Sequence, residues 1–216
     1  NYPELDHPYQ QLIKKTLESF MESKIQSKCI GVDGCSAPQY AFPFTNIATS
    51  MINLIKEQER KNKYSEAINI ILPAIKKFPL LIGGHNRFDS EIIQTTKGRI
   101  FCKGGAEGVF LFADFYKKIG GVIKIEDGNN RAIPSIAMKL FCKFNMLNDY
   151  ENNKLKKWST QKLYNHNNKE NTTLIQHKIP KRIYQTWESK DLSPTINTLC
   201  NLVKENNKNY EYSFFD

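Results

Sequence analysis

The sequence predicts an α+β fold in which helices pack against an antiparallel sheet. Apolar residues recur at helical spacing in several segments before residue 80 and again after residue 132, which indicates amphipathic helices. Between residues 99 and 126, short apolar runs alternate with glycine-containing turns, which is typical of antiparallel strands. With 216 residues, 40% of them hydrophobic, the chain is long enough to bury a core.

Three helices are expected in the first part of the chain. The first opens at Pro8, because proline suits a first helical turn. The second starts near Thr45, whose hydroxyl is expected to cap it. The third spans residues 65–77 and is expected to kink at Pro73. Their expected buried faces are Leu12, Ile13, Leu17 and Phe20, then Ile47, Met51, Leu54 and Ile55, then Ile68, Ile71 and Ile75.

The central part of the chain is expected to form three strands and one helix. Residues 81–89 form a glycine-bearing loop with polar tips, and residues 99–103 form the first strand. Residues 104–108 then turn the chain into a second strand at 109–114. The third strand, at 121–126, ends in an Asp-Gly turn. The helix after it has an expected buried face of Ile133, Ile136, Ala137, Leu140, Phe141 and Phe144.

The composition changes in the last third of the chain. Residues 152–171 are rich in Asn and Lys and contain few apolar residues. A new apolar run at 179–187 predicts a strand, and a helix from Ser193 to about Asn206 leads to a further strand at 210–214. This tail is expected to be a short β-α-β unit. We therefore expect a first domain over residues 1–150, its end with a polar linker over 151–176, and a separate tail over 177–216.

Charge and cysteine content narrow the class of protein. The net charge is +9, but the basic residues are dispersed and form no stripe with interleaved aromatics, so no nucleic-acid partner is expected. The five cysteines are scattered, which argues against a disulfide framework and favours a reducing, cytoplasmic location. No apolar run is long enough to span a membrane, so no membrane partner is expected. Because residue 1 is Asn1, we expect the chain to begin inside a longer protein.

The segment around Asp33 is unusual for an ordinary strand. A short strand at residues 30–32 runs into a tight loop that contains Asp33, Gly34 and Cys35. Asp is costly to bury and Cys is reactive, so one interpretation is a loop that presents both side chains to a ligand. The other interpretation is an Asp-Gly turn with a buried thiol.

Lys103 is the second candidate for chemistry. It stands at a strand end and is followed at once by Gly104 and Gly105, which would let a ligand approach the backbone closely. A lysine in such a place can act as a base or stabilise developing negative charge. The alternative is a hairpin whose lysine points to solvent.

These two segments, together with residues 84–89 and 124–132, occur in the same order as in the C-terminal half of the bacterial asparaginase II family, which residues 1–170 resemble. The resemblance implies a fold similar to that of serine β-lactamases and glutaminases, and hydrolysis of L-asparagine to aspartate and ammonia by two Ser-Lys pairs. It also implies a zinc ion held by two cysteines and a lysine.

The resemblance assigns roles to individual residues of this chain. Cys35 matches a zinc ligand, and Asp33 matches an acid on the substrate side. Lys103 matches a catalytic lysine on a strand, with Gly104 and Glu107 expected to bind substrate beside it. L-asparagine is thus the expected partner, with a homodimer as a further option.

Two elements that the resemblance leads us to expect are not found. The family's other zinc ligands lie in a Cys-Ser-Gly-Lys-His element, and its nucleophile lies in an SxxK motif. The only Ser-x-x-Lys here runs from Ser159 to Lys162 in the polar segment, and we interpret it as chance. The chain by itself is therefore expected to be inactive.

A second resemblance covers the tail. The run at 179–187 and the residues at 209–212 resemble the start of glycosyltransferases that carry a DxD motif, with Tyr184 in place of a usual histidine. The DxD element itself would lie beyond residue 216. Two alternatives to an asparaginase fragment therefore remain, which are a truncated glycosyltransferase and a non-catalytic chimera joined near Asn171.

Overall fold

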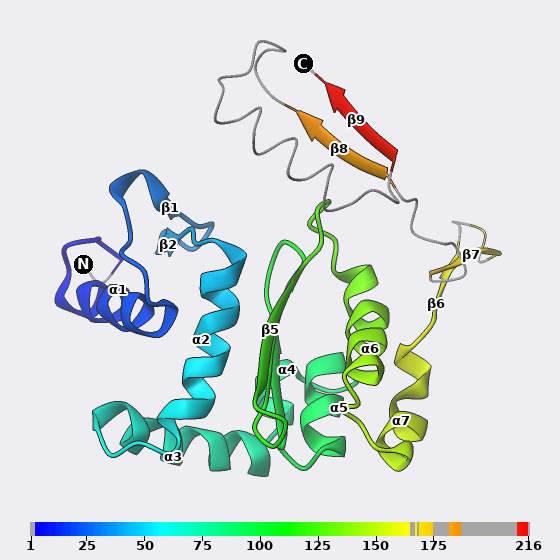
Figure 1. The fold of residues 1–216 in the computed structure, drawn as a ribbon, viewed down its shortest axis with the longest axis horizontal. Coiled ribbons are helices and arrows are strands. Elements are labelled where there is room, and N and C mark those ends of the chain that lie inside the picture. The colour runs from blue at the N-terminus through cyan, green and yellow to red at the C-terminus, as the bar shows by residue number, and fades with distance from the viewer. Residues whose placement is uncertain (1–2, 165–166, 168, 175–181, 187–210, 216) are drawn as a thin grey trace. The chain divides into compact units, whose positions relative to one another are not determined.

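The computed structural model describes residues 3–164, 167, 169–174, 182–186 and 211–215. The chain divides into two compact units, Asn1–Leu174 and Ile175–Asp216, and each is described by itself. The first is a mixture of helices and small antiparallel sheets, which confirms the predicted α+β class (Figure 1).

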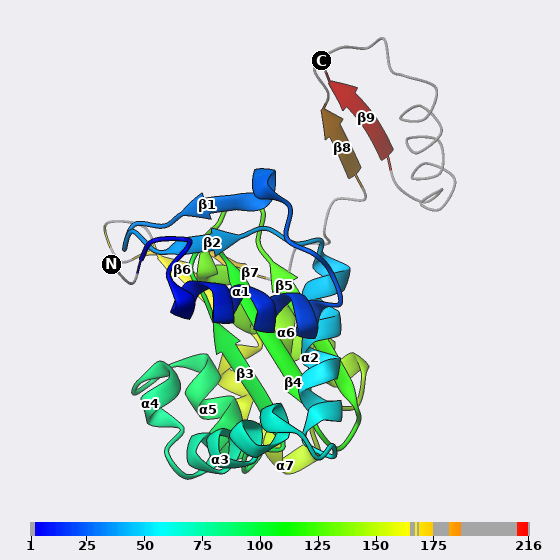
Figure 2. The same cartoon turned by 90° about the vertical axis from the view of Figure 1, so that its left-hand side faces the viewer.

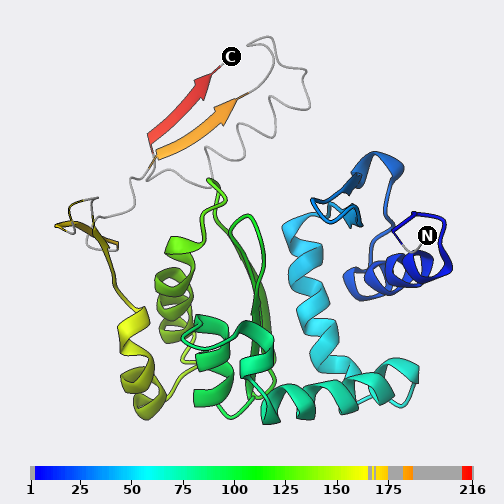
Figure 3. The ribbon, with the colours of Figure 1, turned by 180° about the vertical axis from the view of Figure 1, so that it is seen from behind.

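The centre of the first unit is a three-stranded antiparallel sheet in the order β3-β4-β5. Its strands are β3 at Ile100–Gly104, β4 at Val109–Asp114 and β5 at Ile119–Lys124. Helix α2 covers one face of the sheet, and helices α5 and α6 lie on the other, as Figures 1 and 3 show. Those helices span Phe44–Glu57, Phe88–Thr95 and Ile133–Lys143.

The remaining elements extend this layered centre. Helix α1, Pro8–Met21, packs on α2, and the hairpin of β1, Ile30–Val32, and β2, Pro38–Tyr40, lies near both (Figure 2). Helices α3, Lys63–Lys77, and α4, Leu80–Gly83, lead into α5. After α6 come α7 at Asp149–Leu155 and the hairpin of β6, Gln161–Tyr164, and β7, Glu170–Leu174.

The hydrophobic core lies between the sheet and the α5–α6 layer. The side chains of strand β4 alternate between the two faces of the sheet, and those of Phe110 and Phe112 are buried on the face toward the helices. The ring of Phe112 meets that of Phe141 edge-on at 5.2 Å, and the ring of Phe110 lies 5.4 Å from that of Phe88. Such aromatic pairs stabilise a core beyond the area that they bury.

The opposite face of the sheet is close to α2 because β5 contains Gly120. A Cβ atom at this position would come within 2.7 Å of Met51 Cβ and 2.9 Å of the Ile52 amide nitrogen. Only glycine therefore lets the helix backbone approach the strand at this point. The close approach fixes α2 against the sheet.

A buried ion network joins the sheet to α7. The guanidinium of Arg99 donates to Asp114 Oδ2 at 2.8 Å and to Glu151 Oε2 at 2.7 Å. Asp114 is fully buried, and its Oδ1 also accepts the amides of Tyr116 and Lys117, each at 2.9 Å. One cation thus balances two buried carboxylates.

The structure corrects several expectations about helix ends. Pro43, not Thr45, occupies the cap of α2, and its carbonyl accepts the first helical amides, while the Thr45 side chain makes no cap. Helix α3 begins before Ser65, because Asn62 and Ser65 form a reciprocal capping box. The helix continues across Pro73.

Three residues expected on buried faces are exposed. Leu12 is 54% exposed because the contact face of α1 runs through Ile13, Leu17 and Phe20. Ile71 is 53% exposed because the stripe of α3 runs through Leu72 instead. Phe144 is 48% exposed, since α6 ends at Lys143 and Phe144 is only its cap.

Residues 81–89 are not the loop that the sequence predicts. They include the last three residues of α4 and the start of α5, and only residues 84–87 link the two helices. Strands β3 and β5 are shifted by one and two residues from the expected bounds, whereas β4 begins and ends as expected.

In the second unit, the structure describes two strands. Strands β8, Arg182–Thr186, and β9, Glu211–Phe215, pair in parallel, with Arg182 opposite Glu211. Parallel strands need a crossover connection between them. The helix expected from Ser193 to Asn206 lies outside the described residues. Among the described helices of the chain, none combines the length and the apolar character needed to cross a bilayer.

Candidate functional site

A pocket of about 680 Å³ opens beside the end of β3. This volume lies in the range typical of small-ligand sites. The pocket is built from the start of α5, the end of β3 with its turn, the segment before α6, the start of α6, and a tryptophan after α7. Its lining residues are Asn86, Arg87, Phe88, Asp89, Lys103, Gly104, Gly105, Ala106, Phe110, Asn129, Asn130, Arg131, Ile133, Pro134 and Trp158.

Asp89 is the buried charge of this pocket. It is 5% exposed and lies in the first turn of α5, where an acidic side chain is favoured by the helix dipole. A Cβ atom at Gly83 would come within 2.0 Å of Asp89 Oδ1, so the end of α4 can approach the carboxylate only because residue 83 is glycine. The packing of α4 on α5 therefore sets the position of the carboxylate.

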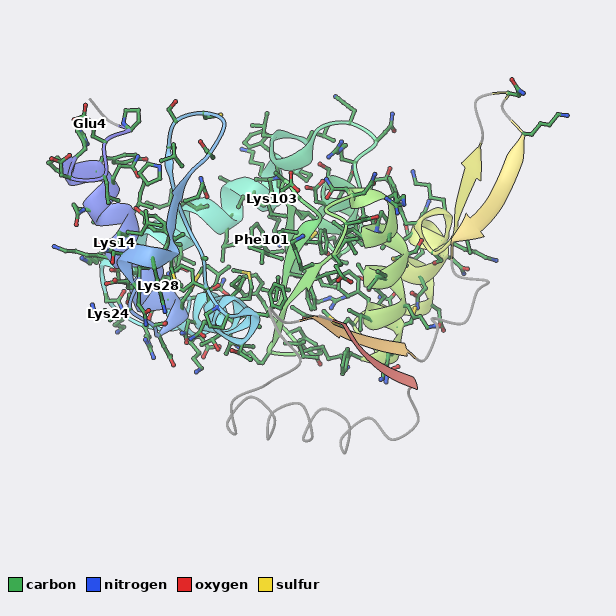
Figure 4. The ribbon with its side chains drawn as sticks, turned by 90° about the horizontal axis from the view of Figure 1, so that it is seen from above. Glu4, Lys14, Lys24, Lys28, Phe101 and Lys103 are labelled. Atoms are coloured by element: carbon green, nitrogen blue, oxygen red, sulfur yellow. The ribbon has the colours of Figure 1, made fainter. Side chains whose placement is uncertain are left out.

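The carboxylate of Asp89 faces the end of β3. Its Oδ2 accepts the Gly104 amide at 3.2 Å and lies 3.7 Å from Lys103 Nζ, while its Oδ1 accepts the Ser90 amide at 3.0 Å. The ammonium of Lys103 also donates to the Gly104 carbonyl. Lys103 thus lies at the wall of the pocket, where its side chain is 48% exposed and its ammonium forms a long ion pair with a buried acid (Figure 4).

Helix α5 also covers the outer edge of β3. The bonds from Gly105 N to Val109 O and from Phe115 N to Arg99 O show that odd-numbered residues of β3 pair with β4. The even-numbered amides therefore point outward. Those of Ile100 and Gly104 donate to Thr96 Oγ1 and Asp89 Oδ2, which are both side-chain atoms at or next to α5.

Cys102 lies behind the pair of Asp89 and Lys103. Its Sγ is 3.6 Å from the Asp89 carbonyl, and the residue is fully buried. Burial, and then the nearby Asp89 charge, raise the pKa of the Cys102 thiol well above its usual range. Cys102 is therefore a neutral packing residue and not a nucleophile.

The opposite wall is a polar segment between β5 and α6. The guanidinium of Arg131 pairs with Asp127, and the Asn129 side chain accepts the Arg131 amide at 2.9 Å. The Asn129 amide first, and then Arg131, lower the pKa of the Asp127 carboxyl. Asn130 Nδ2 reaches the Gly105 carbonyl at 3.4 Å, which links this wall to the turn after β3.

Of the residues proposed from the sequence, Lys103 and Gly104 line the pocket and Glu107 does not. Glu107 has a φ of +56° in the turn, and a Cβ atom on Gly128 would lie 2.6 Å from its Oε2. Its carboxylate therefore lies against the backbone near Gly128, outside the lining.

Asp33 and Cys35 also lie outside the pocket lining. They occupy the loop of the β1–β2 hairpin, where Asp33 Oδ1 accepts the amides of Cys35 and Ala37 at 2.8 and 3.0 Å, and Oδ2 accepts Gln39 Nε2 at 2.9 Å. The Ala37 amide and then the Cys35 amide lower the pKa of the Asp33 carboxyl. The acid thus orders its own loop, and the Cys35 side chain is exposed.

The described residues do not make a complete zinc site. Zinc takes four ligands in structural sites and at least three protein ligands in catalytic ones. Within the described ranges, no group of three or more His, Cys, Asp or Glu residues is placed to hold a metal ion. Cys35 offers one thiol, and the oxygens of its neighbour Asp33 are already bonded within the loop.

The Ser-x-x-Lys of the polar segment does not have the geometry of a nucleophile motif. Ser159 follows the short 3-10 helix Lys156–Trp158, whereas Lys162 belongs to strand β6. The two residues are therefore not one helical turn apart. Ser159 is not among the residues that line the pocket.

Asp89 was not among the site residues predicted from the sequence, although it belongs to the motif at residues 84–89. The available signal was an acid between two apolar positions, Phe88 and Ile92, at a helix start.

Comparison with known proteins gives one family. A family model described as L-asparaginase II matches residues 1–175. A search of curated proteins gives no match. The family match ends at the boundary between the two compact units.

Proposed function

The chain belongs to the L-asparaginase II family, and on this premise we propose that its pocket binds free L-asparagine as the substrate-holding part of an amide-hydrolysing site. The observation that carries the proposal is Lys103, which lines a pocket of suitable size and is held there by the buried Asp89. Hydrolysis of an amide places negative charge on the carbonyl oxygen as the nucleophile attacks. An ammonium fixed at the pocket wall stabilises that charge.

The same lining supports the expectation that this chain does not turn over substrate by itself. None of the residues that line the pocket carries a hydroxyl or a thiol. Lys103 has therefore no hydroxyl or thiol nucleophile within the lining to activate. We infer a binding site that lacks the attacking group, so the expected activity of the chain alone is binding without release of ammonia.

Zinc has no step in this proposal. The resemblance of Cys35 to a metal ligand remains a prediction, because the described chain places no second and third ligand beside it. The roles of Asp33, Gly104 and Glu107 in substrate binding, the cytoplasmic location and a homodimer likewise remain predictions.

The test is a titration of the purified chain with L-asparagine, followed by the amide signals of the folded protein in NMR spectra, with ammonia release measured in parallel. We expect shifts at Lys103, Gly104 and Gly105, and no ammonia above the uncatalysed rate. The Lys103→Met variant should bind more weakly, whereas Lys28→Met should not, because Lys28 lies on the segment after α1, away from the pocket (Figure 4). Absence of shifts in the wild-type chain would overturn the proposal, and steady ammonia release would overturn the inferred lack of turnover.

The second candidate, a glycosyltransferase start or a chimera, concerns the tail. Strands β8 and β9 pair in parallel, as the first two strands of a β-α-β unit do, and the tail belongs to a separate compact unit outside the family match. These observations support a composite chain and leave the glycosyltransferase assignment a prediction. Its test is the coding sequence downstream of Asp216, which should specify an Asp-x-Asp element within a further strand and loop.

A further inference from the structure

The pocket contains an excess of positive charge. Three cationic side chains, Arg87, Lys103 and Arg131, line it, against a single anionic one, Asp89. A concave surface with charge of one sign raises the local concentration of ligands of the other sign. The ligand that this pocket favours therefore carries a negative group.

The three cations differ in whether a carboxylate already engages them. Lys103 is 3.7 Å from Asp89, and Arg131 pairs with Asp127. Among the described residues, no carboxylate is within ion-pair distance of Arg87, and the side chain is exposed. Arg87 is thus the cation of this lining that is free to take a ligand.

The backbone of Arg87 is fixed at the start of α5. The residue is the N-cap of α5, directly before the buried Phe88 and Asp89, and its carbonyl accepts the Glu91 amide at 3.0 Å. Its side chain therefore starts two residues from the carboxylate that holds Lys103. A guanidinium binds a carboxylate through two parallel hydrogen bonds, a geometry that an ammonium cannot offer.

We propose that Arg87 binds the α-carboxylate of the ligand, so that the pocket selects free amino acids over asparagine side chains within a peptide. This inference rests on the proposed function, because it assigns one group of the proposed substrate to one residue. The carboxylate at Arg87 and the side-chain amide at Lys103 are the two ends by which the ligand is held. An internal asparagine of a peptide has no free α-carboxylate and loses the first of these contacts.

Three small ligands separate the groups of asparagine. L-asparagine has the carboxylate, the ammonium and the amide, succinamate lacks only the ammonium, and 3-aminopropanamide lacks only the carboxylate. Each is titrated into the folded wild-type chain and followed by NMR. We expect L-asparagine and succinamate to bind, and 3-aminopropanamide to bind at least about tenfold more weakly, as is usual for the loss of a charge-assisted hydrogen-bond pair.

Variants of Arg87 test the residue itself. Arg87→Gln should weaken L-asparagine and succinamate by about 10- to 100-fold and leave 3-aminopropanamide unchanged. Arg87→Lys should give an intermediate loss, because it keeps the charge without the fork. Lys28→Gln is the matched control, since it also removes one exposed charge, and it should bind all three ligands as the wild type does.

The outcomes distinguish this inference from the proposed function. If the wild-type chain binds L-asparagine and Arg87→Gln binds it equally well, the inference is wrong and the proposed function stands. If 3-aminopropanamide binds the wild type as tightly as L-asparagine does, the inference is also wrong, whatever the variants show. If the wild-type chain binds none of the three ligands, the proposed function fails and the inference fails with it.

Discussion

Replacing Arg99 with methionine should strongly destabilise the first unit. The substitution removes the cation shared by Asp114, which is fully buried, and Glu151, which is 6% exposed. Two carboxylates then remain buried without a balancing charge. Breaking a buried ion pair in this way costs about 3–5 kcal/mol in the free energy of unfolding.

The structure places the expected loss at the lower end of that range. The Arg99 side chain is 26% exposed, so water can reach part of the site, and Asp114 keeps the amides of Tyr116 and Lys117. We therefore expect a loss of about 3 kcal/mol. For a chain of this size, that corresponds to a fall in melting temperature of about 6–12 °C.

The assay is thermal and urea unfolding followed by circular dichroism. The Arg99→Lys variant should lose less, because it keeps the charge but not the two-pronged donor geometry. Adding Glu151→Gln to Arg99→Met should recover part of the loss, since it removes one of the two unbalanced charges. The reasoning fails if Arg99→Met unfolds within about 1 kcal/mol of the wild type, a cost typical of an exposed pair. It also fails if the double variant is no more stable than the single one.

Four further outcomes are expected. Iodoacetamide should alkylate the exposed Cys35 and Cys142 in the folded chain and reach Cys102 only on unfolding. The pKa of Cys102 in the folded chain lies above its value in the unfolded chain. The free energy of unfolding should therefore also fall as pH rises past about 8.5. Mass spectrometry of the alkylated sites checks the first part, and early labelling of Cys102 would contradict it. The pKa of Asp33 in the folded chain lies below its value in the unfolded chain, so the β1–β2 loop should be fully ordered above about pH 4 and lose this order as pH falls further. The NMR signals of the Cys35 and Ala37 amides report this change. Unchanged signals in a chain still folded in acid would count against this prediction. Gly83→Ala should displace the Asp89 carboxylate and weaken L-asparagine binding, as measured by titration of the folded variant. An unaltered affinity would show that the contact is not needed. Added zinc should not raise the melting temperature of the chain, because the single thiol of Cys35 makes a weak zinc site. A clear concentration-dependent rise would point to zinc ligands outside the described residues.

The sheet was predictable from local pattern, but its neighbours were less so. The bounds of β4 follow from the alternation of Val109 to Asp114 between two turns. Helix α5 was missed because Gly83 and Gly84, which precede it, are typical of loops, although Phe88, Ile92 and Ile93 carry the helical spacing. A short helix that is held mainly by tertiary packing gives a weak signal in sequence.

The residues of the candidate site likewise differ in whether local sequence or tertiary packing identifies them. Lys103 was identified because a lysine followed by glycines is a local pattern. Asp89 and Arg87 belong to the pocket because α5 lies along the edge of β3, a tertiary contact between two consecutive elements that local sequence pattern does not specify. Asp33 lies in the tight loop that both interpretations of the sequence place there, but Cys35 is exposed and not the buried thiol of the second interpretation. Local sequence did not reveal that the carboxylate oxygens of Asp33 are bonded within that loop.

The cover that α5 places over β3 has a consequence for solubility. A strand edge with outward amides is a template on which other chains can add strands and aggregate. Here Thr96 and Asp89 engage two of those amides, so the carboxylate that holds Lys103 also keeps the edge closed to other molecules. A substitution that displaces the Asp89 carboxylate would therefore have two effects, because it would weaken ligand binding and also favour self-association.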